Sequence, residues 1–226
     1  MNFLAHHHLD RARGDPWFAA GVAVPDLWPR FRRRGRPGAR LEPLRVAPGV
    51  DGGDPETAAF AAGLARHDEV DRAFHGCAAF RAWRRAAAAR AEPLVGRSAR
   101  AGLLAHVGVE LVLDRWLLVR DAALGGELYA LLEQVPPAAL ERALLALGVD
   151  ARGFAGTFEG FVAARHLLAW TAPEAVAEAL ARTVALLGRP GPGAGALGGF
   201  VADVEAALAR GPARPEAVAD WVFVPA

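Results

Sequence analysis

The chain has 226 residues, of which 53% are hydrophobic and 23% charged, so it can bury a core as one large domain and is neither disordered nor fibrous. Its formal net charge of +1 excludes a chain that binds nucleic acid through its overall positive charge. All 26 basic residues are arginines, so lysine Schiff bases and a phosphate-loop lysine are excluded. Cys77 is the only cysteine, which excludes internal disulfides and multi-cysteine zinc sites. Ser98 is the only serine and therefore the only possible serine nucleophile.

The first residues lack the basic segment and the long apolar segment of a secretory signal. No apolar run approaches the roughly 18 residues that a membrane-spanning helix needs. We therefore expect a cytoplasmic protein without a transmembrane span.

The N-terminal quarter predicts short or irregular elements. Residues 2–12 interleave large apolar residues with three histidines and predict a short helix or a turn. An apolar segment over 17–28 follows and is broken by Pro25. Residues 29–54 are rich in Arg, Gly and Pro and predict mostly irregular structure.

A basic run lies within this irregular segment, from Arg30 to Arg36, with Arg40 beyond it. It is either a solvated loop or a surface that grips phosphate or an acidic protein through bidentate hydrogen bonds. Because aromatic residues are not interleaved with the arginines as stacking recognition requires, we expect no nucleic-acid partner.

Asp54, Pro55 and Glu56 predict the start of a helix that runs to about Gly76. Asp54 can cap free backbone N–H groups, and Pro55 suits the first helical position. Further helices are predicted over residues 77–91, 99–121 (capped by Ser98), 127–134, 137–147, 151–169, 171–188 and 200–209, with a flexible Gly/Pro/Ala linker over 188–199. The sequence therefore predicts an all-α, single-domain helical bundle, in which residues 1–121 form the core and residues 122–226 add further helices.

Two of the predicted helices carry polar residues where an apolar stripe is expected. His67, Asp71 and His75 are four residues apart, and the trio His106, Glu110 and Asp114 has the same spacing. Residues four apart share a helix face, so two such stripes that face each other would gather imidazole and carboxylate ligands. This mixture suits manganese, iron or zinc.

Each of these residues also has a structural explanation as a surface group or a satisfied buried hydrogen bond. Asp68, beside His67, points about 100° away from it on a helix, so we favour Asp71 as a ligand. His75 and Asp114 are either ligands or ion-pair partners of arginines. Asp26, directly after Pro25, is either a solvent-facing cap or a buried ligand.

The opening residues Met1 to His6, with His8, resemble the N-terminus of the acyl carrier protein phosphodiesterases, also called acyl carrier protein hydrolases. Three further elements of that family correspond to Gly21–Asp26, to His67–Asp71 and to a helix over 106–116. The resemblance covers roughly residues 1–120.

This resemblance implies a helical fold similar to that of the HD-type metal-dependent phosphohydrolases and a divalent cation, with manganese favoured. The reaction implied is hydrolysis of the phosphodiester that joins 4′-phosphopantetheine to a serine of acyl carrier protein. The chain departs from the family pattern at Val22, where the family has Asn, and at His75, where it has Asp. His106 and Glu110 also stand where the family more often has two Asp residues and a His.

These observations lead to the hypothesis of a metal-dependent phosphodiester hydrolase acting on acyl carrier protein or on a small phosphoester. Its expected metal ligands are Asp26, His67, Asp71, His106 and Glu110. His6, His8 or His75 is expected to protonate the leaving alkoxide. The alternatives are a non-enzymatic binding or scaffold protein with a structural His–carboxylate network, and a hydrolase of another small phosphoester.

Overall fold

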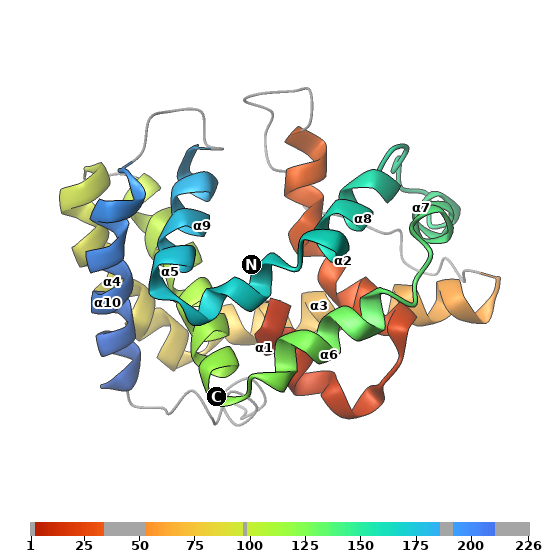
Figure 1. The fold of residues 1–226 in the computed structure, drawn as a ribbon, viewed down its shortest axis with the longest axis horizontal. Coiled ribbons are helices and arrows are strands. Elements are labelled where there is room, and N and C mark those ends of the chain that lie inside the picture. The colour runs from red at the N-terminus through yellow and green to blue at the C-terminus, as the bar shows by residue number, and fades with distance from the viewer. Residues whose placement is uncertain (1–2, 34–52, 97–98, 186–191, 211–226) are drawn as a thin grey trace. The chain divides into compact units, whose positions relative to one another are not determined.

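The computed structural model describes residues 3–33, 53–96, 99–185 and 192–210, and all regular structure within these ranges is helical. The predicted all-α class is therefore confirmed. In chain order the helices are α1 (Phe3–Asp10), the 3-10 turn η1 (Arg11–Arg13), α2 (Pro16–Arg33), α3 (Pro55–Gly76), α4 (Ala78–Val95), α5 (Ala99–Arg120), α6 (Ala123–Leu132), α7 (Pro137–Ala146), α8 (Ala155–Ala164), the 3-10 turn η2 (His166–Thr171), α9 (Pro173–Ala185) and α10 (Ala194–Ala209) (Figure 1).

The chain divides into two compact units, and neither is a continuous stretch of sequence. The first unit comprises Met1–Ala5, Val70–Ala122 and Leu168–Ala226, and the second comprises His6–Glu69 and Ala123–Leu167. The boundary passes through α1, α3 and η2, so each of these helices contributes residues to both units.

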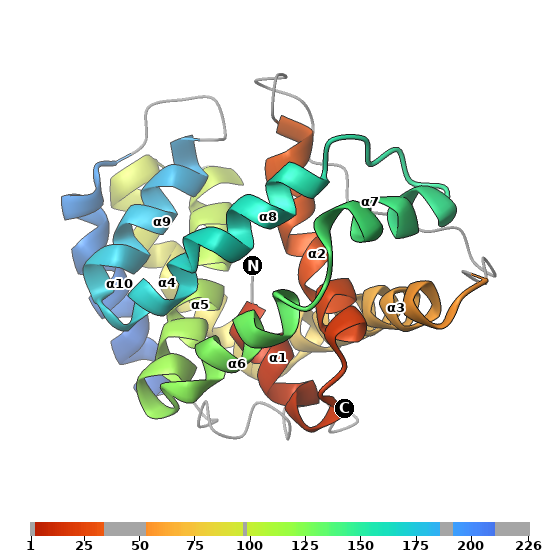
Figure 2. The same ribbon diagram turned by 45° about the vertical axis from the view of Figure 1, so that its right-hand side comes forward.

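The first unit is built around α5, which packs against α4, α9 and α10. These four helices lie side by side in both ribbon views (Figures 1 and 2). Every residue of α5 from Val107 to Asp114 is buried, as expected of a helix covered on all sides. Gly108 allows α10 to approach closely, since a Cβ added there would lie 2.9 Å from Cζ of Phe200.

In the second unit α2 packs against α6 and α8, and α7 packs against α8. A contact between α2 and α3 depends on two glycines. A Cβ added to Gly21 would overlap the Phe60 carbonyl oxygen, and one added to Gly63 would overlap the Phe18 carbonyl oxygen. The two backbones can therefore touch only while both positions remain glycine.

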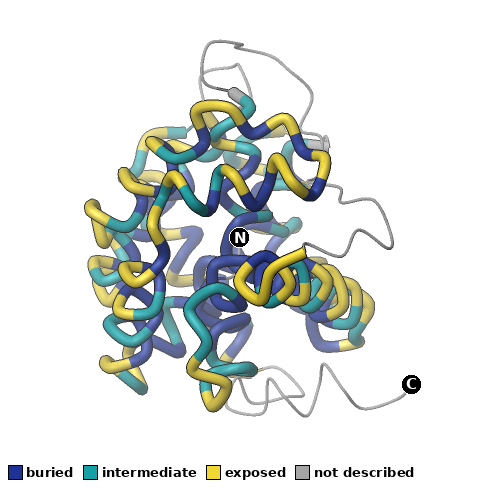
Figure 3. The backbone as a smooth tube through the Cα atoms, turned by 90° about the vertical axis from the view of Figure 1, so that its right-hand side faces the viewer, coloured by how far each residue is buried: buried dark blue, intermediate teal, exposed yellow. Residues whose placement is uncertain are grey.

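Buried and exposed positions alternate along single helices, as the colouring in Figure 3 shows. Among the described residues, the large apolar side chains that are exposed are Val119 and Leu145. No helix in the described part of the chain combines the length and the apolarity needed to cross a membrane.

The predicted start of α3 is confirmed in atomic detail. Asp54 accepts hydrogen bonds from the Thr57 backbone N–H (2.9 Å) and from the Thr57 hydroxyl (2.7 Å), and Pro55 is the first helical residue. These bonds hold the pKa of Asp54 below its usual value. The predicted cap Ser98 and residues 34–40 of the predicted basic run lie outside the described residues.

Several predicted boundaries are wrong because tertiary packing outweighs local helix propensity. Helix α2 continues through Pro25 and Pro29 to Arg33, although the segment was expected to break at Pro25. The predicted linker is helical over residues 194–199, where Leu197 is fully buried, while residues 188–191 lie outside the described ranges. The predicted helix over 151–169 ends at Ala164, because Arg165 adopts a left-handed conformation with φ of 43°.

Candidate metal centres

The side chain of His67 is buried on α3, one turn after the Gly21–Gly63 contact. Its Nδ1 lies 2.9 Å from the Val22 carbonyl oxygen of α2. Because a carbonyl oxygen only accepts hydrogen bonds, Nδ1 must carry the proton, and Nε2 of the neutral ring keeps its lone pair for a cation. A backbone carbonyl on the second ring nitrogen is the usual way in which proteins orient a metal-binding histidine.

His6 lies against this ring. The two ring centroids are 4.4 Å apart and the planes differ by 24°, so the imidazoles are stacked. His6 is 1% exposed, which places both rings in the interior of the second unit.

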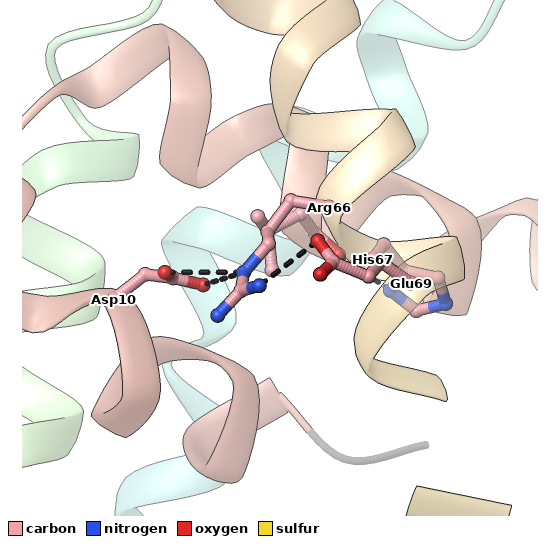
Figure 4. Close-up of polar contacts among 5 residues, drawn as sticks. Asp10, Arg66, His67 and Glu69 are labelled. Atoms are coloured by element: carbon pink, nitrogen blue, oxygen red, sulfur yellow. Dashed lines mark hydrogen bonds and ion pairs between the residues drawn. The ribbon is translucent and has the colours of Figure 1, made fainter. Parts of the chain in front are cut away.

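The surface of α3 next to His67 is held by ion pairs. Nε of Arg66 lies 3.0 Å from Oδ2 of Asp10, and the Arg66 guanidinium also donates to Glu69. Figure 4 shows the His67 ring on the side away from the Asp10 carboxylate. The ion pairs thus attach α3 to the end of α1 without using the ring that could bind a cation.

Asp71 follows His67 by one turn on the same continuous helix, so the helix itself sets the position of one side chain relative to the other. His6, His67 and Asp71 each offer one atom that could bind a metal ion. We call these residues the first triad. Asp68, which the helical geometry disfavoured, is exposed.

A second triad lies within the first unit and comprises His75, His106 and Glu110. Nε2 of His75 is 2.8 Å from Oε1 of Glu110, and Nε2 of His106 is 3.1 Å from the same oxygen. Nδ1 of His75, on the other side of its ring, is 3.5 Å from Oδ2 of Asp71. The two imidazoles of the second triad therefore converge on one carboxylate oxygen of the third residue, Glu110.

Burial and these contacts shift the pKa values of Glu110 and His75 in opposite directions. Burial favours the neutral acid of Glu110, but the positive charge of the N-terminus, together with hydrogen bonds from His106 and His75, holds the pKa of Glu110 well below its usual value. For His75 burial favours the neutral ring and therefore lowers the pKa. The hydrogen bond to Glu110 and the attraction to Asp71 outweigh burial and raise the pKa above 6.5. Glu110 is therefore a buried carboxylate anion.

Aromatic rings surround the two histidines. Phe80 packs against His75 with a centroid distance of 4.9 Å and against His106 edge-on at 5.2 Å. Phe74 lies 4.7 Å from Phe80. The second triad thus has an apolar wall, which strengthens electrostatic interactions with its ligand atoms.

The structure distributes the expected ligands over two groups. His67 and Asp71 lie together with His6, and His106 and Glu110 lie together with His75. His6 and His75, expected to transfer protons, thus lie among the candidate ligands. Asp26 on α2 and His8 on α1 are half-buried and belong to neither triad.

Asp114, at the end of the second predicted stripe, is fully buried. Its carboxylate accepts hydrogen bonds from the backbone N–H groups of Leu4 (3.2 Å) and Ala5 (3.0 Å), the first turn of α1. These N–H groups have no partner within a helix, so Asp114 completes the start of α1.

His7, which the sequence did not single out, is also buried. Burial lowers its pKa to about 4, so the ring is neutral at physiological pH. The only feature of the sequence that could have drawn attention to His7 is its place between two other histidines.

Comparison with known proteins gave no match: no protein-family model, no curated protein and no solved structure is significantly similar to this chain.

Proposed function

We propose that the protein is a divalent-metal-dependent phosphodiester hydrolase whose cation is held by the first triad. One observation carries the proposal. His67 has its Nδ1 proton fixed on the Val22 carbonyl oxygen, and its ring stacks on His6, with the Asp71 carboxylate one helical turn away. These features support a metal-ligand set with an oriented histidine.

The stacked rings of His6 and His67 lie together in the second unit, and the α3 helix itself places Asp71 one turn from His67. Two imidazoles and one carboxylate suit manganese, which we favour, or iron or zinc. A divalent cation in such a site supplies hydroxide near neutral pH and offsets the charge of phosphoryl oxygens.

The proposed substrate rests on the resemblance of residues 1–120 to the acyl carrier protein phosphodiesterases, and so does an HD-like version of the all-α fold. On this basis the substrate is the phosphopantetheine linkage of acyl carrier protein, with another small phosphoester as the alternative. Arg30 and Arg32 near the end of α2 are candidates for contact with the acidic carrier protein. His8 remains the candidate for protonating the leaving alkoxide.

The test is hydrolysis by full-length protein that has been stripped of metal and reloaded with Mn²⁺. Substrates are holo acyl carrier protein, followed by the mass lost with the prosthetic group, and bis(p-nitrophenyl) phosphate. We expect Asp71→Asn and His67→Asn to reduce turnover by about 100-fold or more. Asp68→Asn, an exposed carboxylate change on the same helix, is the matched control and should leave turnover unchanged.

Two outcomes would contradict the proposal. One is a folded, metal-loaded protein that is inert toward all phosphodiesters. The other is turnover in Asp71→Asn equal to that of Asp68→Asn. A folded protein that takes up no metal at all would favour the non-enzymatic alternative, in which the histidines and carboxylates form a structural hydrogen-bond network.

A further inference from the structure

We infer that the second triad, His75, His106 and Glu110, is a cation site in its own right, with a preference for transition metals such as zinc. This site uses neither His6 nor His67. The inference concerns metal binding and does not depend on the proposed hydrolysis.

The geometry of the second triad is that of ligands around one ion. Two bonds of about 2.0–2.2 Å at tetrahedral or octahedral angles place neighbouring ligand atoms roughly 3.0–3.5 Å apart. The two Nε2 atoms lie 2.8 and 3.1 Å from Oε1 of Glu110. An ion can therefore enter after loss of the Nε2 protons and a small widening of the triad.

The contact on the other ring nitrogen of His75 supports this assignment independently. Nδ1 faces the Asp71 carboxylate at 3.5 Å while Nε2 faces the triad. A carboxylate on the far nitrogen of a histidine is the arrangement that proteins use to orient a metal-binding ring and make it more basic. Asp71 is thus a positioning residue for the second triad.

Burial and exposure also match a site that an ion can reach. Glu110 forms the closed side, with a side chain only 2% exposed. The side chains of His75 and His106 are 28% and 29% exposed, so their edges reach solvent. An incoming ion would meet the imidazoles first and the carboxylate last.

Burial of the Glu110 carboxylate costs folding free energy unless the carboxylate binds a cation or positively charged or hydrogen-bonding partners. It lies on α5 between Val109 and Leu111, both fully buried, in the central helix of the unit. Burying a carboxylate costs several kcal/mol that paired charges must offset. A divalent cation would bond directly to the Glu110 carboxylate and take the place of the two imidazole hydrogen bonds that it displaces.

The ligand types select the class of metal. Two of the three ligands are imidazoles, which suit zinc, iron, cobalt and nickel, whereas magnesium and calcium prefer sites built from oxygen alone. Three protein ligands leave at least one coordination position open for water or substrate. We therefore expect Zn²⁺ and Co²⁺ to bind and Mg²⁺ not to displace them.

Cobalt titration of metal-free, full-length protein tests the inference through visible absorption and the number of ions bound. We expect two ions in the wild-type chain and one ion in both His106→Asn and Glu110→Gln. His67→Asn should also bind one ion, lost from the first triad. His166→Asn is the matched control, a half-buried histidine outside both triads, and should still bind two.

A measurement on the unmodified chain covers the case in which a variant does not fold. Addition of Zn²⁺ should shift the imidazole ¹⁵N resonances of His75 and His106, and excess Mg²⁺ should not reverse the shift. Unshifted resonances would overturn the inference, and so would cobalt binding that is unchanged in folded His106→Asn and Glu110→Gln. Cobalt bound at the second triad without phosphodiester hydrolysis would overturn only the proposed function.

Discussion

The two buried carboxylates of α5 are compensated in different ways, although they lie one helical turn apart. Glu110 faces two histidine side chains, whereas Asp114 accepts hydrogen bonds from the backbone of α1. In the inferred cation site, histidine protons around the first would be exchanged for a cation, whereas the second offers no such exchange, because backbone N–H groups do not ionise. Equal spacing on a helix face therefore does not imply equal function.

Tyr129 offers a test of burial at a single residue, because it is the only tyrosine in the chain. Its side chain is fully buried, and its hydroxyl oxygen accepts a hydrogen bond from the Leu167 backbone N–H at 3.3 Å. Burial raises the pKa of Tyr129 from 10.0 to about 12. In absorbance at 295 nm we expect a tyrosinate midpoint near 12 in the folded protein and near 10 in urea.

The same shift gives the sign of the stability change at alkaline pH. Because the pKa is higher in the folded chain, the contribution of Tyr129 to stability is complete below pH 10 and is lost as pH rises through 12. The loss is roughly 3 kcal/mol. Tyr129→Phe should abolish the tyrosinate signal, and a midpoint near 10 in folded wild-type protein would show that the hydroxyl is accessible to water.

At the scale of helices, the sequence predicted those elements whose ends carry their own local signals. Asp54 and Pro55 start α3 as expected, and the periodicity of residues 99–121 matches α5 closely. The sequence did not predict that α2 passes through Pro25 or that α10 begins at Ala194. Both depend on contacts with distant helices, which local propensity does not contain.

The candidate site, like the helices, was predictable from the sequence only where local spacing determines it. The spacing correctly placed His67, Asp71 and His75 on one helix. Residues four apart drift by about 40°, so His67 and His75 differ by roughly 80° around α3 and face different neighbours. Tertiary packing determines which neighbours each histidine faces. For this reason the sequence predicted one set of ligands and not two separate triads.

The glycine contact between α2 and α3 leads to a prediction about how these two helices pack. A Cβ on Gly63 would overlap the Phe18 carbonyl oxygen and lie 2.9 Å from Cα of Gly21, so the helices would have to separate. We expect Gly63→Ala to lower the free energy of unfolding by about 1–3 kcal/mol. It should also weaken the proposed metal binding at the first triad, because separation lengthens the hydrogen bond from His67 to the Val22 carbonyl oxygen.

The matched control is Gly102→Ala in α5, where an added Cβ has no neighbour within 4 Å. Alanine is the better helix former, so this change should raise stability by up to about 1 kcal/mol. Urea unfolding measures both variants. Equal effects of the two substitutions would contradict a close approach of α2 and α3.

At the scale of the whole molecule, the order of segments along the chain has a consequence for folding. The first unit needs Val70–Ala122 together with residues from Leu168 onward, because α9 and α10 cover α5. The second unit likewise joins His6–Glu69 to Ala123–Leu167. Residues 1–121, the helical core expected from the sequence, therefore contain only part of each unit.

Cleavage of the chain between residues 122 and 123 tests this dependence. The fragment 1–122 lacks α9 and α10, so the apolar side chains of α5 that these two helices cover would be exposed to water. We expect each fragment alone to lose cooperative unfolding in circular dichroism, and an equimolar mixture of the two to recover it. If 1–122 alone unfolded cooperatively with the stability of the full chain, the helices after residue 167 would contribute no essential part of the core around α5.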